Sequence, residues 1–357
     1  MIPCIRKVKN NPQPKRPRAG VNVSHNLAPQ KTDLRLGRIV SLLMENATVV
    51  VSGTKIADEI GTARSEVWRL VQQLRRLGVE IAGHTASGYQ LKAVPDLLLP
   101  DMLAPFLTGT IFGGEIHHYY RLGSTNSEAM ERASGGAPEG SVFVAEEQTA
   151  GRGRGAHQWE SAASAGIYCS VVLRPTLPPA ETLILSLAAG LAVHAAVRQV
   201  DSGVVPDLKW PNDLLIEGKK FCGVLTEMNA EVTRVRYIVV GIGINVNQVR
   251  FPEELRPTAT SLRLTTDRVW SRVELCAALL KSLDREYRDL IQKAGAHDSI
   301  LERFHERSSS VRGRHVQVEE NGGGFEGVTD GLDERGFLRV KTGQGLRTVL
   351  SGTVRLK

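Results

Sequence analysis

The sequence predicts an α+β protein with three parts: an N-terminal winged helix-turn-helix domain, a central α+β domain with a mixed or antiparallel sheet, and a small C-terminal β-barrel. Three observations support this prediction. Apolar residues recur at helical spacing before residue 80, helix-like and strand-like segments alternate over 105–305, and short strands separated by glycines follow residue 310. We place the domains at 34–94, 95–307 and 308–357, after a basic tail over 1–33 that we expect to be disordered.

The N-terminal domain is predicted from three helices and a hairpin. We expect helices over 36–46 and 55–60, and a third helix that runs from a cap at Thr62 to Leu77. The third helix has a single apolar face, formed by Val67, Leu70, Val71, Leu74 and Leu77. Turn residues between alternating residues over 81–91 indicate a β-hairpin, which would be the wing.

The central domain is predicted from strands interrupted by long helices. In order, we expect strands over 141–146 and 166–174, an apolar helix over 182–200, successive strands over 208–247 and a helix over 271–293. The last helix begins with a capping box formed by Ser271 and Glu274. The barrel strands are expected around Val316, Phe325, Leu338 and Val349.

Composition and charge argue against several classes of protein. The formal net charge is +7, but the first twenty residues carry six Lys or Arg and no acid, so the rest is nearly neutral. The tail is either a solvated extension or an arm that attracts phosphates. The four cysteines are scattered, which argues against a disulfide framework or a Cys-based zinc site and favours a reducing cytoplasm. No apolar run approaches the length of about 20 residues that a membrane span needs, so we expect no membrane partner.

The most specific stretch is a basic glycine loop. Gly151-Arg152-Gly153-Arg154 follows a predicted strand and the pair Gln148-Thr149. Glycines at alternate positions let the backbone approach a phosphate closely, and the arginines between them supply charged hydrogen-bond donors. The G-x-G-x-x-G spacing of a dinucleotide fingerprint is absent. Taken alone, the stretch is equally well explained as a flexible basic surface loop.

Three further motifs flank the loop. Leu122-Gly123-Ser124-Thr125-Asn126 presents small polar groups at a helix start, where Thr125 and Glu128 also form a capping box. Lys209-Trp210-Pro211-Asn212-Asp213 precedes Lys219 and Lys220, and Lys220 leads into a buried-looking strand, where low dielectric would strengthen its pull on an anion. At any other position, these lysines would be ordinary hairpin charges. Gly241-Ile242-Gly243-Ile244-Asn245-Val246-Asn247 places glycines in a strand, which indicates close approach by another backbone or a ligand.

Taken together and in this order, the four motifs resemble those of the biotin–protein ligase family. The three-part plan, with a helix-turn-helix domain before the ligase and a small SH3-like β-barrel after it, looks like the bifunctional ligase/repressor branch. The resemblance covers about residues 34–357. It implies that biotin and ATP form biotinyl-5′-adenylate and pyrophosphate with Mg²⁺ present. Biotin would then pass to a lysine of the biotin carboxyl carrier domain of a carboxylase.

The resemblance implies a role for each motif residue. The residues implied to bind biotin are Ser124, Thr125, Asn126, Gln148, Arg152, Gly153, Arg154 and Lys220. Those implied to bind the nucleotide are Arg154, Trp159, Asn212, Lys220 and Asn245. Because two anions must meet, Lys220, Arg152 and Arg154 would act in catalysis as fixed cations. Asp213 either assists deprotonation of the acceptor lysine or is a structural carboxylate.

The second half of the glycine loop departs from the family pattern. Many members continue the loop with further arginines, whereas Gly155-Ala156-His157-Gln158 stands here. His157 replaces an arginine that would meet the adenylate phosphate, and histidine carries less positive charge than arginine at neutral pH. Because Arg152 and Arg154 remain, we expect catalysis to persist, with weaker or pH-dependent retention of the adenylate.

The third helix is the predicted recognition helix for DNA. Arg64, Ser65, Trp68 and Arg69 lie near its N-terminal end, where base-reading and phosphate-contacting groups are needed. Trp68 is just off the apolar stripe, so packing against the wing is an equal alternative. The resemblance implies operator DNA as a partner. The modest net charge of +3 over 34–94 suggests that a homodimer is needed for useful affinity.

Two other functions stay open at this point. A transcription regulator can use a catalytically inactive ligase fold as a biotin sensor, but the presence of Lys220, Arg152 and Arg154 argues against this alternative. A lipoate ligase shares the fold. The Gly-Arg-Gly-Arg loop and the N-terminal winged helix favour biotin over lipoate.

Overall fold

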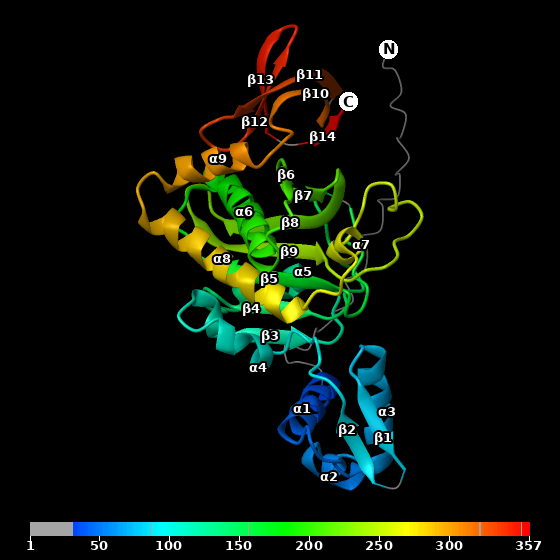
Figure 1. Cartoon of the computed structure of the whole chain (residues 1–357). Helices are drawn as coiled ribbons and strands as arrows, with labels where there is room; N and C mark the ends of the chain where they lie inside the picture. The colour runs from blue at the N-terminus through cyan, green and yellow to red at the C-terminus, as the bar shows by residue number, and fades with distance from the viewer. Residues whose placement is uncertain (1–30, 86, 156, 321–322, 351) are drawn as a thin grey trace, which may run out of the picture.

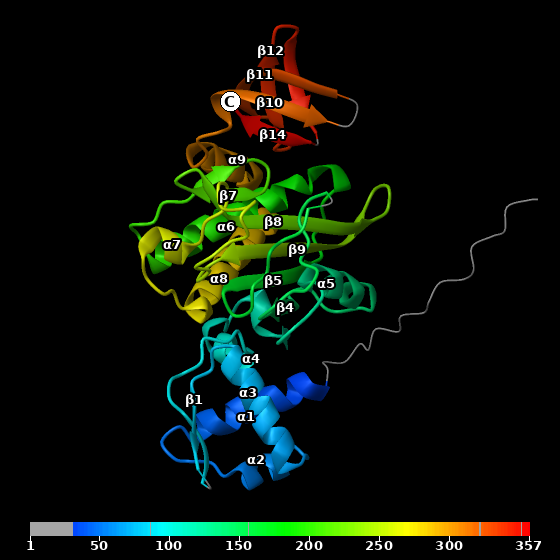
Figure 2. The same ribbon diagram turned by 90° about the vertical axis from the view of Figure 1, so that its right-hand side faces the viewer.

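The computed structural model describes residues 31–85, 87–155, 157–320, 323–350 and 352–357 of the chain. Figures 1 and 2 show three lobes in a row: a helical N-terminal lobe at one end, a large α+β lobe in the centre and a small all-β lobe at the other end. The order of the three lobes confirms the predicted one. Residues 1–30 of the predicted tail lie outside the described residues. Residues 31–33 of that tail belong to the first helix, which begins at Lys31.

The N-terminal lobe contains the predicted three helices and hairpin. They are α1 (Lys31–Glu45), α2 (Gly53–Glu59), α3 (Arg64–Arg76), β1 (Ile81–His84) and β2 (Gly88–Leu91). Val51 bridges β2, and Gly88 is required there because a Cβ would lie 2.0 Å from the Val51 carbonyl oxygen. The prediction that Thr62 caps α3 was wrong, because its N–H closes the end of α2 on the Ala57 carbonyl and Ala63 is the N-cap.

The apolar face of α3 closes the core of this lobe, as predicted. The residues that α3 buries are Val67, Leu70, Val71 and Leu74. Leu97 and Leu99 of the segment that leads into the central lobe join the same core, whereas Leu98 between them joins the core of the central lobe. Successive residues of an extended segment point in opposite directions, so this run of leucines ties the two lobes together.

A seven-stranded mixed sheet forms the middle of the central lobe, in the order β3-β4-β5-β9-β8-β7-β6. β3 and β4 are parallel, and every other neighbouring pair is antiparallel. The strands are β3 (Ile116–Tyr119), β4 (Val142–Ala145), β5 (Gly166–Leu173), β6 (Asp207–Lys209), β7 (Asp213–Ile216), β8 (Lys219–Ala230) and β9 (Val235–Asn245). The mixed sheet confirms the predicted fold class.

Helices cover both faces of this sheet. The α-helices are α4 (Pro100–Leu103), α5 (Thr125–Ser134), α6 (Leu183–Val200), α7 (Leu262–Thr266), α8 (Arg272–Gln292) and α9 (Ala296–Glu306). Short 3-10 turns are η1 (Ala104–Phe106), η2 (Ile111–Gly113) and η3 (Pro179–Glu181). The predicted capping box of α8 is confirmed on one side, because Ser271 accepts a hydrogen bond from the N–H of Glu274.

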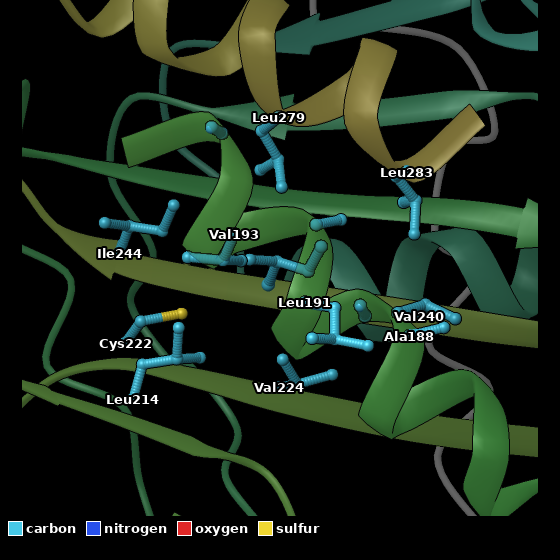
Figure 3. Packing of buried hydrophobic residues seen from close by; sticks show 14 of the residues in the cluster. Ala188, Leu191, Val193, Leu214, Cys222, Val224, Val240, Ile244, Leu279 and Leu283 are labelled. Carbon is cyan, nitrogen blue, oxygen red and sulfur yellow. The ribbon is translucent and has the colours of Figure 1, made fainter. Parts of the chain in front are cut away.

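The helix α6 occupies the centre of the core. Figure 3 shows it between the strands, represented by Val224, Val240 and Ile244, and the side chains of Leu279 and Leu283 on α8. The expectation that no apolar run is long enough for a membrane was wrong by length and composition, because an 18-residue window within residues 179–200 has a mean hydropathy of 1.7. Of this window, 67% is buried inside the fold. A helix covered by a sheet and a second helix needs apolar residues on most of its surface.

The C-terminal lobe is a five-stranded antiparallel sheet in the order β13-β12-β11-β10-β14. Its strands are β10 (Arg312–Glu320), β11 (Gly323–Leu332), β12 (Leu338–Thr342), β13 (Gly345–Val349) and β14 (Thr353–Leu356). The predicted strands are confirmed, but the predicted SH3-like barrel does not close. The two edge strands, β13 and β14, each pair on one side only among the described residues, because no register joins them to each other.

Candidate active site

The floor of the candidate site lies on the face of the sheet opposite α6. Strand register places three glycines in two adjacent rows, which are Tyr168, Gly243, Gly223 and Asp213, and then Ser170, Gly241 and Leu225. Residues that alternate with these, such as Cys169, Val224 and Ile242, belong to the apolar core. One face of the sheet is therefore a packing face, and the other is hollowed by glycines.

Two side chains from other elements lie over the glycines of the floor. A Cβ at Gly243 would lie 2.6 Å from Cε2 of the Trp159 ring, and a Cβ at Gly223 would lie 3.0 Å from its Cζ3. A Cβ at Gly241 would lie 1.9 Å from Oδ1 of Asn126. The close approach predicted from the glycine motif is thus an approach by side chains of the same protein.

The start of α5 supplies the first polar wall. Ser124 is the N-cap, and its hydroxyl accepts a hydrogen bond from the N–H of Ser127. The predicted capping box of Thr125 and Glu128 was therefore wrong, because Thr125 already lies in the first turn and Glu128 pairs with Arg132 on the same helix. The N–H of Thr125 donates instead to Oε1 of Gln148, at 2.8 Å.

Asn126 of this wall is tied to the sheet by three side-chain hydrogen bonds. Its Nδ2 donates to the Leu225 carbonyl at 3.2 Å and to Oε2 of Glu227 at 3.0 Å. Its Oδ1 accepts from the Ser170 hydroxyl at 2.6 Å. These bonds fix the amide plane across the floor, so its orientation is set before a ligand arrives.

The basic glycine loop is a short hairpin that folds back over the floor. The N–H of Trp159 donates to the Gly151 carbonyl at 2.9 Å, and the N–H of Gly153 donates to the His157 carbonyl at 2.8 Å. A Cβ at Gly151 would lie 2.4 Å from the Trp159 carbonyl oxygen, so the base of the hairpin requires glycine. Gly155 has a φ of +67°, which is the left-handed region that glycine favours.

Lys220 reaches the site because of a β-bulge. The register pairs Cys222 with Leu214 and Lys220 with Leu215, which leaves Phe221 as an extra residue on β8. Phe221 and Cys222 are both buried in the core, so Lys220 emerges on the opposite face, beside Gly223. Bulges next to active sites commonly redirect a side chain in this way.

The cations of the site differ in how they are neutralised. Lys220 Nζ lies 2.6 Å from Oδ1 of Asp213, and Arg152 forms a two-pronged pair with Glu227. Arg154 has no salt-bridge partner within the described part of the chain. Burial lowers the pKa of Arg154, and the nearby Asp213 charge opposes that shift. A partly buried guanidinium without a partner favours the binding of an anion.

The motif Lys209-Trp210-Pro211-Asn212-Asp213 forms the turn between β6 and β7, and its Trp210–Pro211 peptide bond is cis. Trp210 is buried, and its Nε1 donates to the Gly336 carbonyl of the C-terminal lobe at 2.8 Å. Nδ2 of Asn212 donates to the Val224 carbonyl at 2.7 Å. The motif thus positions Asn212 and Asp213, which are both predicted site residues. Through Trp210 it also fixes the C-terminal lobe at the edge of the site.

These walls enclose a cavity of about 680 Å³, which is within the usual range for small-molecule sites. The predicted site residues that line it are Ser124, Thr125, Asn126, Gln148, Arg152, Gly153, Arg154, Trp159, Asn212, Asp213 and Lys220. Asn245 does not line it, since its Nδ2 donates to the Thr260 carbonyl at the end of β9. Thr353 and Val354 of the C-terminal lobe close the far side.

Sequence reasoning missed several residues of the site. Ser170 and Glu227 hydrogen-bond to Asn126 of the lining, and Tyr168 lines the cavity directly. A signal was available for Glu227, because Gly223, Leu225 and Glu227 alternate along one strand and therefore share a face. No local signal in the sequence places the C-terminal strands beside the loop.

The predicted recognition helix presents its candidate residues to solvent. Arg64, Ser65 and Arg69 are exposed on α3, and Trp68 is 59% exposed. This exposure argues against the alternative in which Trp68 packs on the wing. Arg69 forms an ion pair with Glu66 one turn earlier, at 2.6 Å, so only Arg64 has no such partner among these described arginines.

Comparison with known proteins agrees with this architecture. Family models match residues 119–245 (biotin/lipoate A/B protein ligase family), 35–90 (HTH domain) and 312–357 (biotin protein ligase C terminal domain). The bifunctional ligase/repressor BirA of Bacillus subtilis is 35% identical over 320 residues, which cover 89% of this chain and 97% of that protein. This chain belongs to the biotin protein ligase family. The predicted resemblance is confirmed.

Two further relatives support the assignment to the family. The biotin–[acetyl-CoA-carboxylase] ligase of Mycobacterium tuberculosis is 37% identical over 241 residues, covering 66% of this chain and 86% of that protein. The solved structure of biotin protein ligase from Aquifex aeolicus in complex with biotin and ATP is 31% identical. It has a TM-score of 0.58 and covers 68% of this chain and 99% of that chain.

Replacing Gly243 with alanine tests the contact between the floor and the loop. The added Cβ would lie 2.6 Å from the Trp159 ring, so the ring must move and carry the base of the hairpin with it. Overpacking of this kind costs about 1–3 kcal/mol, and the same free energy taken from binding would lower ligand affinity by about 5- to 150-fold. Titration calorimetry with biotin and with ATP measures this loss. Gly114→Ala is the control, because its Cβ would meet no atom within 4 Å; equal affinities in Gly243→Ala and wild type would contradict the prediction.

Proposed function

We propose that this chain is an ATP-dependent biotin–protein ligase that also binds DNA as a biotin-responsive repressor. The ligase activity forms biotinyl-5′-adenylate from biotin and ATP, releases pyrophosphate and transfers biotin to the ε-amine of a carrier-domain lysine. One observation carries the ligase proposal: a neutral polar wall at the start of α5 and a cation cluster at Arg154 and Lys220 line the same cavity.

The polar wall fits the ureido end of biotin. Ser124, Thr125, Asn126 and Gln148 supply donors and acceptors that are held by their neighbours. Uncharged groups in fixed orientations recognise a neutral ureido group, because each unmatched hydrogen bond inside a cavity costs free energy. We assign biotin binding to these residues and to Arg152, Gly153, Arg154 and Lys220.

The cation cluster fits the reacting anions. A carboxylate and an α-phosphate repel each other, so Arg154 and Lys220 lower the barrier by neutralising both in an enclosed cavity. Trp159 and Asn212 lie on the same wall and are assigned to the nucleotide. The buried Nε1–H of Trp159 has no hydrogen-bond partner among the described residues. Asn245 is a weaker candidate, because its amide already bonds the Thr260 carbonyl.

Mg²⁺ is proposed to arrive with the nucleotide. The described residues contain no cluster of three or more His, Cys, Asp or Glu side chains that could hold a metal. Mg²⁺ commonly binds through substrate phosphates, waters and one or two carboxylates. When bound to ATP, it would neutralise the leaving pyrophosphate.

Asp213 lies 2.6 Å from the Lys220 ammonium. We therefore assign Asp213 to positioning Lys220, in preference to acting as a base for the acceptor lysine.

Pyrophosphate release tests the ligase proposal directly. Purified protein with ATP and Mg²⁺ is expected to release pyrophosphate on addition of biotin and to label an isolated biotin carrier domain. Release with lipoate but not with biotin would show a lipoate ligase. Biotin binding without pyrophosphate release would show a catalytically inactive sensor.

The winged helix supports the DNA-binding half of the proposal, in which a homodimer binds an operator. The direct test is selection of bound duplexes from a random pool, followed by binding assays at several salt concentrations. Arg64→Ala is expected to weaken binding by about tenfold, because one arginine contact to a base or phosphate is lost. Arg285→Ala, an exposed arginine on α8, is expected to bind as wild type does. Selection that enriches no sequence would contradict operator binding.

The cytoplasm is the proposed location. Cys169, Cys222 and Cys276 are buried and free, which suits a compartment that keeps thiols reduced. ATP and the carboxylase carrier domain are also available there.

A further inference from the structure

Glu227 of β8 connects the two walls of the cavity. Its carboxylate accepts two parallel hydrogen bonds from Arg152, at 3.0 Å from Nη1 to Oε2 and 2.8 Å from Nη2 to Oε1. Oε2 also accepts from Nδ2 of Asn126 at 3.0 Å. The glycine loop, the start of α5 and the sheet therefore meet at one carboxylate. Glu227 itself does not line the cavity.

The glycine loop has few other ties to the sheet. The hydrogen bonds of its hairpin are internal, and its ring contact with the floor comes from Trp159 at its base. Within the described residues, the pair of Arg152 with Glu227 is the only salt bridge between 151–159 and the sheet. Arg152 stands between two glycines, which allow the backbone wide freedom, so an unpaired guanidinium would sample many orientations. A two-pronged carboxylate contact fixes both its position and its plane.

Because of the same pair, the two arginines of the loop differ in whether their charge is neutralised. Glu227 neutralises Arg152 beside the polar wall, where the proposed ligand group is an uncharged ureido. Arg154 has no such partner among the described residues, and it stands with Lys220 where the proposed ligand groups are anions. A carboxylate at Glu227 thus keeps excess positive charge away from the neutral end of the ligand.

We propose that Glu227 is a positioning residue that latches the glycine loop over the ureido end of the biotin pocket. The proposal rests on the proposed function, because it assigns that end of the cavity to biotin. Glu227 acts through Arg152 and Asn126 and does not contact the ligand. Without the carboxylate, the loop opens and Arg152 loses its fixed orientation.

The variant Glu227→Gln removes the charge and nearly preserves the volume. Glutamine offers one acceptor oxygen and an amide NH₂ that opposes the guanidinium, so the two-pronged contact is lost. We expect the KM for biotin to rise by about tenfold. The KM for ATP and the rate of transfer from preformed adenylate are expected to stay within about twofold. This split separates a latch at the biotin end from a general loss of structure.

Limited proteolysis supplies a readout that does not depend on activity. Trypsin cleaves after arginine, and Arg152 and Arg154 both precede glycines in the loop. We expect cleavage at these sites to be several-fold faster in Glu227→Gln than in wild type when biotin is absent, because an open loop fits the protease better. Saturating biotin is expected to slow cleavage in both proteins. Equal cleavage rates and equal biotin KM values would overturn the proposal.

Glu231→Gln is the matched control. Glu231 follows β8 on the same hairpin and pairs with Arg236 at 2.7 Å, but neither residue lines the cavity. Its biotin KM and cleavage rate are expected to equal those of wild type. The same changes in both variants would show a general charge effect and overturn the latch.

Glu227→Asp keeps the proposal testable if the glutamine variant folds poorly. Aspartate keeps the charge on a side chain that is shorter by one methylene, so Glu227→Asp is expected to keep part of the biotin affinity that Glu227→Ala loses. Equal biotin affinities in Glu227→Asp and Glu227→Ala would overturn the role of the charge. A failure of the proposed function can be distinguished from a failure of the latch. If the chain is not a biotin ligase, wild type releases no pyrophosphate with biotin, but the proteolysis comparison still measures whether Glu227 holds the loop.

Discussion

Replacing Lys220 with methionine is expected to lower the rate of biotin adenylation by about 10²–10³, which is the typical loss when one donor that stabilises developing negative charge is removed. Lys220 Nζ lies beside Asp213 at 2.6 Å and 5.3 Å from the centroid of the Trp159 ring, on the floor of the cavity. Methionine keeps most of the apolar stem against Gly223, so the wall keeps its shape. The loss should therefore appear in kcat for pyrophosphate release more than in the KM for biotin.

Two controls separate the charge of Lys220 from other effects. Lys219→Met removes the neighbouring, exposed lysine and is expected to change the rate by less than about twofold. Lys220→Met also leaves Asp213 without its ion-pair partner, so the double variant Lys220→Met/Asp213→Asn removes both charges. Recovery of activity in the double variant, or an unchanged rate in Lys220→Met, would contradict the assigned role.

Replacing Arg272 with methionine is expected to destabilise the protein by about 3–5 kcal/mol, which is the usual cost of leaving a buried charge without its partner. Arg272 is 1% exposed and donates from Nη1 to Oε2 of Glu146 at 2.7 Å, and Glu146 is fully buried. Nε of Arg272 also donates to Asp96 at 3.2 Å, and Glu146 accepts from the N–H of Leu98. The network joins α8, the end of β4 and the segment between the first two lobes.

Thermal unfolding measures the Arg272 effect, and we expect the Tm to fall by roughly 10 °C. Lys293→Met is the control, because Lys293 and Asp289 form an exposed ion pair at the end of the same helix, and its loss should cost less than about 1 kcal/mol. The double variant Arg272→Met/Glu146→Gln should be more stable than Arg272→Met alone. Equal Tm values for wild type and Arg272→Met would contradict the prediction.

The same network predicts how stability depends on pH. Burial would raise the pKa of Glu146, but the charge of Arg272 and the hydrogen bond from His118 outweigh it and lower the pKa from 4.5 to about 2. A lowered folded-state pKa stabilises the fold above pH 4.5, and this contribution is lost as the pH falls toward 2. Glu146→Gln is expected to flatten the decline of Tm between these pH values. If Tm declines with the same slope in both proteins, other carboxylates cause the decline.

Much of the fold follows from local sequence patterns. The apolar stripe on α3, the strand over 166–174 and the Ser271 half of the capping box are properties of short segments, and the structure confirms each. Predictions that depended on competing local bonds were less reliable. Thr62 and Thr125 both look like caps, yet neighbouring residues take the capping role at both helix starts.

The C-terminal lobe shows a second limit of local patterns. Glycine spacing predicts its strands correctly, because each strand is a short segment with turn residues at both ends. Whether the two edge strands meet depends on strand tilt and register over the whole sheet, which no single segment encodes. Here β13 and β14 do not pair in the described part of the lobe.

The sequence alone determined which residue types meet at the site: the glycine loop, the polar helix start and the lysine before a strand are local motifs with specific chemistry. Only the tertiary structure decided which way those side chains point. Strict alternation from Gly223 would turn Lys220 into the core, and the bulge at Phe221 turns it into the cavity. In the sequence, Glu227 looks like an ordinary strand residue. Strand register and loop geometry place Arg152 and Asn126 beside its carboxylate. A bulge and a long-range ion pair depend on contacts between distant segments, which short-range patterns do not specify.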